Sequence, residues 1–297
     1  MSSGRAHRLE VALAALALAL LVLAVFGPAL SAGFVNWDDP RHLLENPHYR
    51  GLSREHLAWM VSTSWMGPYQ PLAWLSLALD HALWGLSGPR EFPEAGRWHA
   101  TSIAWHAAAA VACLAAAQRL FARVAPAAPP RSRLIAAWVA AALFALHPLR
   151  VESVAWLTER RDVVSGALAA LCLWAWCGWV RAGPAARASA RAAWAGCALS
   201  AAALGLFWAS VDTASQAALA WRGPGAPGLA AAALCLIAAC AASARGGLAS
   251  VGPRRFGLAV LCFALSLAGK GTGMTLPAAL LVPLPASESA KQSSASP

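Results

Sequence analysis

Charged residues are scarce in this chain of 297 residues. They make up only 12% of the sequence, no more than 13 residues are acidic, and apolar residues make up 59%. This apolar surface exceeds what a soluble domain of this size could bury, so the composition predicts an integral membrane protein. The net charge of +10 lies in short arginine clusters and not in one basic stripe, which argues against a nucleic acid partner.

Cysteine is absent from the polar connections of the chain. All seven cysteines lie within apolar runs, where they are expected to act as small buried hydrophobic residues. The sequence also lacks HxH and HExxH spacings, which argues against a zinc site. The cysteines are Cys113, Cys172, Cys177, Cys197, Cys235, Cys240 and Cys262.

Long apolar runs predict an all-α bundle of membrane helices. A helix that crosses a bilayer needs about 20 apolar residues, and the runs predict about seven or eight spans. The last two runs flank the sequence GKGTG and could form two short spans or one broken helix. The expected spans cover residues 9–30, 98–121, 134–146, 163–180, 192–210, 229–244, 256–268 and 274–284.

Arginine clusters predict the orientation of these spans. The clusters within 119–133, 181–191 and 245–255 contain no acidic residue, so the positive-inside rule assigns them and the N-terminus to the cytoplasm. The other loops hold 11 of the 13 acidic residues and are expected to face the periplasm or lumen. The first span could be an uncleaved anchor or a signal peptide, and its length favours the anchor.

The first outward loop, residues 31–97, is too long for a simple connection. Leucines recur in it at helical spacing, but the apolar run is too short to span a bilayer, which predicts an interfacial helix. Tryptophans near this helix fit an aromatic belt or platforms for stacking a sugar or lipid. The leucines are Leu72, Leu75, Leu79, Leu83 and Leu86, and the tryptophans are Trp37, Trp59, Trp65, Trp74, Trp84 and Trp98.

Two adjacent carboxylates, Asp38 and Asp39, follow the first span on its outward side. A carboxylate within hydrogen-bond reach of a hydroxyl can take its proton as general base, and Asp38 is the expected base. The pair could instead hold a divalent cation such as magnesium or manganese. A hydrated turn at the end of the first helix is the third interpretation.

The sequence HPLRVESVAWLTERRD contains a second candidate segment on the outward side. A helix that begins at Pro148 would place Glu152, Trp156 and Glu159 on one face, beside Arg160. This face combines two carboxylates with a cation. It could serve catalysis or form a structural network of ion pairs.

Lys270 is the only lysine before the C-terminal tail, and glycines lie on both sides of it at Gly269, Gly271 and Gly273. A cation this close to an apolar span either reaches to the membrane interface or binds an anion. The glycines would let the backbone approach a ligand closely.

Four blocks carry a resemblance to a known family: FVNWDDPRHLLENPHYRGL, QPLAWLSLALDHALWGL, ALFALHPLRVESVAWLTERRDVVSGALAALCLWAW and, more loosely, SLAGKGTGMTLPAALLV. They resemble the membrane part of the transmembrane and tetratricopeptide-repeat proteins, GT-C-type glycosyltransferases related to the protein O-mannosyltransferases. The resemblance implies a membrane domain of GT-C type over residues 1–284, followed by a disordered tail at 285–297.

Two departures from that family pattern are visible. The last block usually has a proline directly after its lysine, where this chain has Gly271. The tetratricopeptide repeats that normally follow the membrane part are absent from these residues. A truncated chain that lacks part of its acceptor site is therefore expected.

The resemblance implies transfer of a mannose-like sugar from a polyprenyl-phosphate donor to a hydroxyl acceptor, a protein serine or threonine, on the outer face. Asp38 would act as base, while Asp39 and Glu152 would position the acceptor or a divalent ion. Cations would stabilise the departing lipid phosphate. The expected catalytic residues are Asp38, Asp39 and Glu152, the expected phosphate ligands are Arg160, Arg161 and Lys270, and His147 and Trp156 are expected to support the site.

Two other functions fit the composition. A transporter or flippase of lipid-linked sugars is one, but such proteins hold charges near the middle of their spans, and here Lys270 is the one candidate. An inactive membrane assembly protein, left by truncation, is the other.

Overall fold

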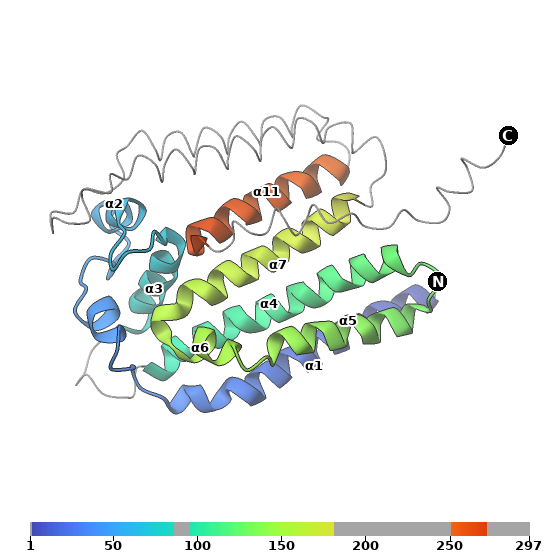
Figure 1. Ribbon diagram of the computed structural model, residues 1–297, viewed down its shortest axis with the longest axis horizontal. Coiled ribbons are helices and arrows are strands. Elements are labelled where there is room, and N and C mark those ends of the chain that lie inside the picture. The colour runs from blue at the N-terminus through green and yellow to red at the C-terminus, as the bar shows by residue number, and fades with distance from the viewer. Residues whose placement is uncertain (1, 86–94, 181–250, 272–297) are drawn as a thin grey trace.

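The computed structural model describes residues 2–85, 95–180 and 251–271, and every regular element in these ranges is a helix. Within them, five long helices lie side by side along the long axis of the molecule (Figure 1). The all-α prediction is thus confirmed for the described residues. The five helices are α1 (Ser2–Phe26), α4 (Ala95–Val124), α5 (Pro130–Ala145), α7 (Arg160–Val180) and α11 (Val251–Gly269).

Among the described residues, three helices are long and apolar enough to cross a membrane, namely Gly4–Ser31, Ala95–Val124 and Leu157–Val180. The apolar helix Arg255–Gly269 is shorter, and α5 has 16 residues. These helices indicate a membrane protein. The predicted spans at 192–210, 229–244 and 274–284 and the tail at 285–297 lie outside the described residues, so the total of seven or eight spans stays a prediction.

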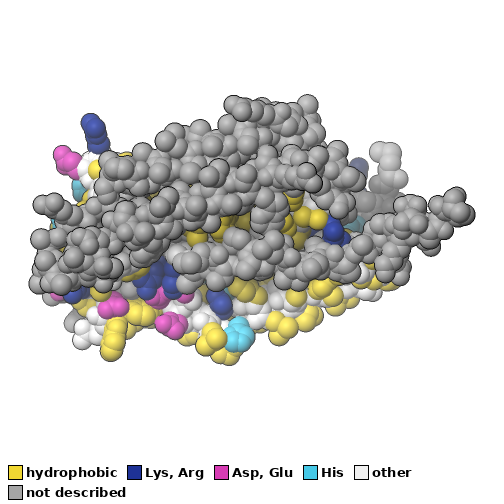
Figure 2. Space-filling view, turned by 45° about the horizontal axis from the view of Figure 1, so that its top comes forward, with side chains coloured by type: hydrophobic (Ala, Val, Ile, Leu, Met, Phe, Trp, Pro, Cys, Tyr) yellow, Lys and Arg dark blue, Asp and Glu magenta, His cyan; other side chains and the backbone are white. Residues whose placement is uncertain are grey.

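Helix α1 turns most of its apolar side chains away from the bundle. Only 17% of its most apolar stretch is buried within the protein, and Leu13, Leu16 and Leu20 are each more than half exposed. On the face seen in Figure 2, apolar side chains cover the middle of the described surface, and charged side chains gather mostly toward its left end. Such a surface fits contact of the middle with acyl chains and of the ends with headgroups.

Small side chains build the interior of the bundle. Helix α4 packs against α1, α5 and α7, and α7 packs in turn against α11. Ala110, Ala137 and Ala145 are fully buried among these helices. Small residues let membrane helices approach closely, so packing replaces the hydrophobic driving force that lipid removes. The four described cysteines are free. Cys172 and Cys262 are buried, as predicted, whereas Cys113 and Cys177 are only partly buried.

Short helices gather at one end of the bundle, at the left in Figure 1. This end also holds a second core, which includes the fully buried Tyr49, Trp74, Trp98 and Leu157. The long first loop is therefore a packed structure and not an extended connection. The short elements are η1 (Gly27–Ser31), η2 (Pro40–Leu44), α2 (Arg54–Ser62), α3 (Pro71–Trp84), α6 (Arg150–Ala155) and η3 (Leu157–Glu159).

Helix α3 forms over the stretch predicted to be an interfacial helix. Its Trp74 and Leu77 are buried, while Leu79 and Leu83 are 46% and 71% exposed. The predicted aromatic roles are wrong for Trp74 and Trp98, because both side chains are fully buried core residues. Trp37 is 76% exposed and remains available to a membrane surface or a ligand.

Candidate active site

Three segments that lie far apart in the sequence meet at the end of the bundle that carries the short helices (Figure 1). The first contact joins the loop after α1 to the turn before α7. Asp39 Oδ1 accepts hydrogen bonds from the Thr158 amide at 3.0 Å and from the Thr158 hydroxyl at 2.6 Å. Asp39 Oδ2 accepts a third hydrogen bond from the Val35 amide at 2.8 Å. These bonds fix the acidic loop against the start of α7.

The two adjacent aspartates have different environments. Asp39 is fully buried, and burial raises the pKa of its carboxyl, although its hydrogen bonds to Thr158 and Val35 oppose that rise. Asp38 is only half-buried, and no described group hydrogen-bonds to its carboxylate. Asp39 thus holds the loop in place, and Asp38 is the carboxylate of the pair that a substrate could reach.

A network of ion pairs joins the start of α7 to the end of α11. Lys270 Nζ lies 2.9 Å from Glu159 Oε2 and also pairs with Asp162. Arg161 pairs with Glu159, and Asp162 accepts a hydrogen bond from Ser153 Oγ at 2.9 Å. Partial burial lowers the pKa of Lys270, but the hydrogen bonds to Asp162 and Glu159 outweigh this effect and raise the pKa above its ordinary value. Lys270 therefore stays charged at neutral pH.

Gly269 permits the close approach that brings Lys270 into this network. A Cβ atom at residue 269 would lie 3.2 Å from Ser165 Cα, so a larger residue would displace one helix from the other. The hydroxyls of Ser165 and Ser266 lie 3.0 Å apart beside this contact. The sequence predicted that these glycines admit a ligand, whereas Gly269 admits a neighbouring helix.

Arg160 is a buried structural residue. Its side chain is 0% exposed, and Nη1 lies 2.7 Å from Asp80 Oδ2 in α3. Nε donates to Ser102 Oγ at 2.9 Å, and Nη2 donates to the Trp98 carbonyl at 2.7 Å. Nη1 also donates to Ser76 Oγ at 3.2 Å. This environment does not fit the predicted contact of Arg160 with a lipid phosphate, because the guanidinium is enclosed by protein groups from α3 and α4.

Arg161 and Lys270 keep partial access to solvent. Their side chains are 18% and 25% exposed, against 0% for Arg160. Of the three predicted phosphate ligands, these two are the ones that an incoming anion could reach. Both already pair with carboxylates, so an anion would have to share them with Glu159 and Asp162.

The predicted helix from Pro148 through Glu159 is interrupted. Helix α6 ends at Ala155, and Trp156 adopts an extended backbone with φ −98° and ψ 117° before η3 begins. As a result Glu152 is exposed and Glu159 is buried, so the two carboxylates do not share a face. The common acidic face was a wrong prediction, because a periodicity argument assumes that the helix is unbroken.

Of the two predicted supporting residues, Trp156 stands at this break and His147 lies before α6. His147 is exposed, and its Nδ1 accepts a hydrogen bond from the Leu149 amide at 3.3 Å. Trp156 is half-buried, and its indole N–H is buried without a hydrogen-bond partner among the described residues. Trp156 therefore adjoins Leu157 and the core of the first loop, while His147 caps the turn before α6.

His42 is a buried site residue that the sequence did not single out. Its ring stacks on Trp74 with centroids 4.3 Å apart, and Nε2 lies 3.2 Å from Gln70 Nε2. Burial lowers the pKa of His42 to about 3, with the charge of Arg161 acting in the same direction and that of Glu159 opposing it. His42 is thus neutral at physiological pH. His42 follows Asp39 by three residues in the sequence DPRH, and this spacing could have indicated that it lies near the site.

A divalent cation held jointly by Asp38 and Asp39 does not fit this arrangement. Both oxygens of Asp39 already accept hydrogen bonds from protein groups. In the described ranges, no group of three or more histidine, cysteine, aspartate or glutamate side chains could hold a metal ion. Magnesium can complete its shell with water, but it still needs carboxylate oxygens that face it. The fully buried Asp39 carboxylate is directed at Thr158 and Val35 instead.

Comparison of the chain with protein-family models, with curated proteins and with solved structures finds no match.

Proposed function

We propose that the protein is an integral membrane glycosyltransferase of GT-C type. It would transfer a mannose-like sugar from a polyprenyl-phosphate donor to a hydroxyl acceptor, such as a protein serine or threonine. One observation carries the proposal. The hydrogen bonds from Thr158 and Val35 to Asp39 tie the loop that bears Asp38 to the turn before α7, next to the Arg161 and Lys270 network.

This juxtaposition supplies the two groups that glycosyl transfer from a lipid phosphate requires. Asp38 would accept the proton of the acceptor hydroxyl as its oxygen bonds to the anomeric carbon. The bond from that carbon to the phosphate oxygen breaks, and the lipid phosphate leaves with the electron pair. Arg161 and Lys270 would stabilise the charge that develops on the leaving group. Arginine also suits bidentate phosphate contact.

The geometry supports a smaller set of phosphate ligands than the sequence predicts. Arg160 is left out, because its fully buried guanidinium is committed to Asp80, Ser102 and Trp98. Its role would be to position α7 against α3 and α4. Glu152 is exposed and remains a candidate for contact with the acceptor.

A bilayer setting accounts for the apolar surfaces beside this end of the bundle. The exposed Leu79 and Leu83 of α3 would lie in the interface, and the polyprenyl chain would lie against the outer surface of the helices. The N-terminus would be cytoplasmic and the site periplasmic or lumenal, as the arginine clusters indicate. The protein would thus meet its lipid donor within the membrane and its acceptor outside it.

The two alternatives differ in where charge should lie. A transporter of lipid-linked sugars would hold charges near the midplane, whereas the ion pairs of Glu159 and Lys270 lie at the ends of α7 and α11. An inactive assembly protein would use the same ion pairs only for stability. Variants of Lys270 and Asp162 separate that alternative from catalysis.

Lys270→Gln removes a cation, and Asp162→Asn releases the same cation from a carboxylate. If Lys270 grips the lipid phosphate, the first change loses a charge-assisted contact worth roughly 1.5 to 3 kcal/mol, which is about a 10- to 100-fold rise in donor KM. The second change should leave the donor KM equal or lower. Transfer from polyprenyl-phosphate mannose to a serine and threonine peptide, with purified protein in vesicles, measures both.

A purely structural network predicts a different pattern. Both variants would then lose similar thermal stability, because each removes one partner of the same ion pair, and the donor KM would not change. An unchanged KM in both variants would contradict the assignment of Lys270 to the donor phosphate.

A further inference from the structure

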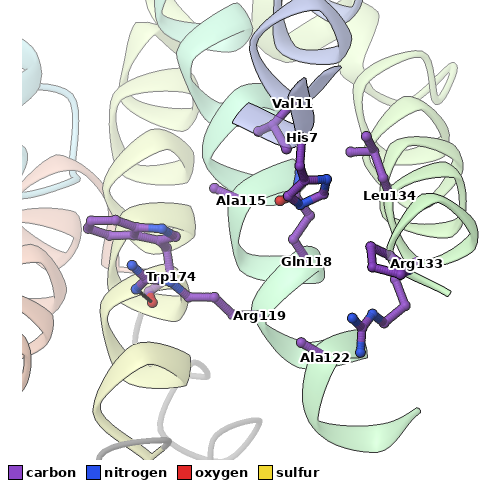
Figure 3. A pocket seen from close by; sticks show the side chains of 10 residues that line it. His7, Val11, Ala115, Gln118, Arg119, Ala122, Arg133, Leu134 and Trp174 are labelled. Atoms are coloured by element: carbon purple, nitrogen blue, oxygen red, sulfur yellow. Dashed lines mark hydrogen bonds between the residues drawn. The ribbon is translucent and has the colours of Figure 1, made fainter. Parts of the chain in front are cut away.

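A cavity of about 340 Å³ lies between α1, α4, α5 and α7, at the end of the bundle opposite the candidate active site. In the view of Figure 3, Arg119 and Trp174 lie on one side of α4, Arg133 and Leu134 on the other, and His7 above Gln118 between them. The volume falls within the range of small-ligand sites and exceeds what one ordered water needs. The cavity is therefore large enough for the headgroup of a small amphiphile.

The polar side chains of this cavity are suited to an anion. Arg119, Arg133 and His7 line it, and among the described residues no acidic side chain does. The nearest carboxylate to this set is that of Glu10, which pairs with His7 at 3.7 Å and with Arg131 at 2.7 Å. Arg119 is fixed in place, because its guanidinium carbon lies 3.9 Å from the centroid of the Trp174 ring and its Nη1 donates to the Trp174 carbonyl at 2.5 Å. Arg133 donates from Nη1 to the Pro126 carbonyl at 3.2 Å, which holds it at the start of α5.

Gln118 adds an unmet donor to these charges. Its Nε2 is buried, and no described group accepts a hydrogen bond from it. Buried donors are normally satisfied by protein, water or ligand, and an unmet one costs free energy. A phosphate oxygen in the cavity would meet this donor together with the arginines.

The remaining walls of the cavity are apolar. Val11 and Leu134 line it. Exposed apolar side chains, among them Leu9 and Leu13 of α1 and Ile135 of α5, lie on the outer surfaces of the same two helices. A ligand with an anionic head and apolar chains would match both parts of the surface. A phosphate without chains would match only the head of the site.

We propose that this cavity binds the phosphate of an anionic phospholipid from the leaflet on the N-terminal side, with its acyl chains lying along α1. Basic pockets between membrane helices on the cytoplasmic side recognise such headgroups. The inference stands apart from the proposed glycosyl transfer, because it uses no residue of that site. The bound lipid would hold α1 and α5 against α4 in the bilayer.

Binding of phosphatidylglycerol and of phosphatidylcholine to the purified full chain tests this site. Native mass spectrometry and thermal shift in detergent both report the bound lipid. We expect phosphatidylglycerol to bind and to raise the melting temperature, and phosphatidylcholine to do neither. Equal behaviour of the two lipids would overturn the proposal.

Arg133→Gln and Arg131→Gln form a matched pair of variants. Arg131 lies two residues away on the same helix, with a side chain 81% exposed that pairs with Glu10 outside the cavity. Arg133→Gln should weaken phosphatidylglycerol binding by about ten-fold, and Arg131→Gln by about two-fold or less. An equal loss in both would show attraction to surface charge only and would contradict a built site.

Two further measurements keep the test decisive. Gln118→Leu, which keeps the size of the side chain, should also weaken lipid binding. It serves as the test variant if Arg133→Gln fails to fold. Inorganic phosphate at millimolar concentration should compete weakly, because it lacks acyl chains. Full displacement of the lipid by inorganic phosphate, or unchanged lipid binding in Gln118→Leu, would contradict a lipid phosphate in the cavity.

Discussion

Replacement of Arg160 by glutamine is expected to unfold the end of the bundle that carries the candidate site. The Arg160 guanidinium is fully buried, pairs with Asp80 at 2.7 Å and donates to Ser102, Ser76 and Trp98. Glutamine cannot replace these contacts, and Asp80 would be left as an uncompensated buried carboxyl. Removal of one partner of a buried ion pair costs about 3 to 5 kcal/mol. That loss is a large part of the stability of a typical domain, about 5 to 15 kcal/mol.

The direction of the Asp80 pKa supports this expectation. Burial already raises the pKa of Asp80 above its usual value, and Arg160 opposes that rise. Without Arg160 the pKa would rise further, so Asp80 would take up a proton on folding. Asp80→Asn in the Arg160→Gln background removes the orphan carboxyl and should recover part of the lost stability.

Thermal stability in detergent, followed by size-exclusion chromatography after heating, measures this effect. Arg161→Gln is the matched control, because the adjacent side chain is partly exposed and, among the described residues, forms its ion pair with Glu159. We expect a large loss of folded protein for Arg160→Gln, a small loss for Arg161→Gln and partial rescue in the double variant. A folded Arg160→Gln protein that fails only in donor binding would refute this reasoning and make Arg160 a phosphate ligand.

Two other predictions concern pH and helix packing. Burial lowers the pKa of His42 to about 3 in the folded protein. Below about pH 6.5 the unfolded chain gains a proton on this residue that the folded protein does not, so the free energy of unfolding falls by up to about 1.4 kcal/mol per pH unit until the pH nears 3. The melting temperature should fall more steeply from pH 7 to pH 4 in wild type than in His42→Asn. Parallel curves would show that His42 does not contribute to the pH dependence of stability. Gly269→Val should separate α11 from α7 and lower both stability and transfer, because its Cβ would meet Ser165. Gly257→Val, where a Cβ would meet no described atom within 4 Å, is the control, and equal losses would contradict the packing argument.

Hydropathy predicted the helices well, because a bilayer requires long apolar segments whose backbone groups are satisfied internally. Helices α4, α7 and α11 cover predicted spans completely, and α1 and α5 cover most of theirs. The positive-inside rule also predicted that the acidic loop, the segment after α5 and Lys270 share one side. Asp39 contacts Thr158 and Lys270 contacts Glu159, so these residues do meet at one end of the bundle, while the side of the membrane that this end faces stays a prediction.

The roles of neighbouring residues could not be read from the sequence. Arg160 and Arg161 are adjacent and chemically identical, yet one faces Asp80 and the other faces Glu159. Rotation of about 100° per helical residue separates them, and the partner helix decides which is buried. The break at Trp156 escaped prediction for a related reason, because no proline or glycine marks it. It coincides with tertiary contacts to the first loop, from Thr158 to Asp39 and from Leu157 to the core that contains Tyr49.

The same limit applies to the aspartate pair. The sequence places Asp38 and Asp39 on equal terms, and only the contact with Thr158 separates a buried anchor from an accessible carboxylate. Asp39→Asn is expected to destabilise the fold, because in either orientation of the amide its NH₂ would face a donor, at Thr158 or at the Val35 amide. Asp38→Asn should leave the fold intact.

Transfer of sugar from polyprenyl-phosphate mannose by purified Asp38→Asn protein tests the central claim most directly. Asparagine keeps the shape of the side chain and removes the proton acceptor. Turnover should fall by about 100-fold or more, with the melting temperature and donor KM unchanged, because general base catalysis contributes about that factor. Wild-type turnover in Asp38→Asn, with a wild-type protein that transfers the sugar under the same conditions, would contradict the assignment of Asp38 as the base.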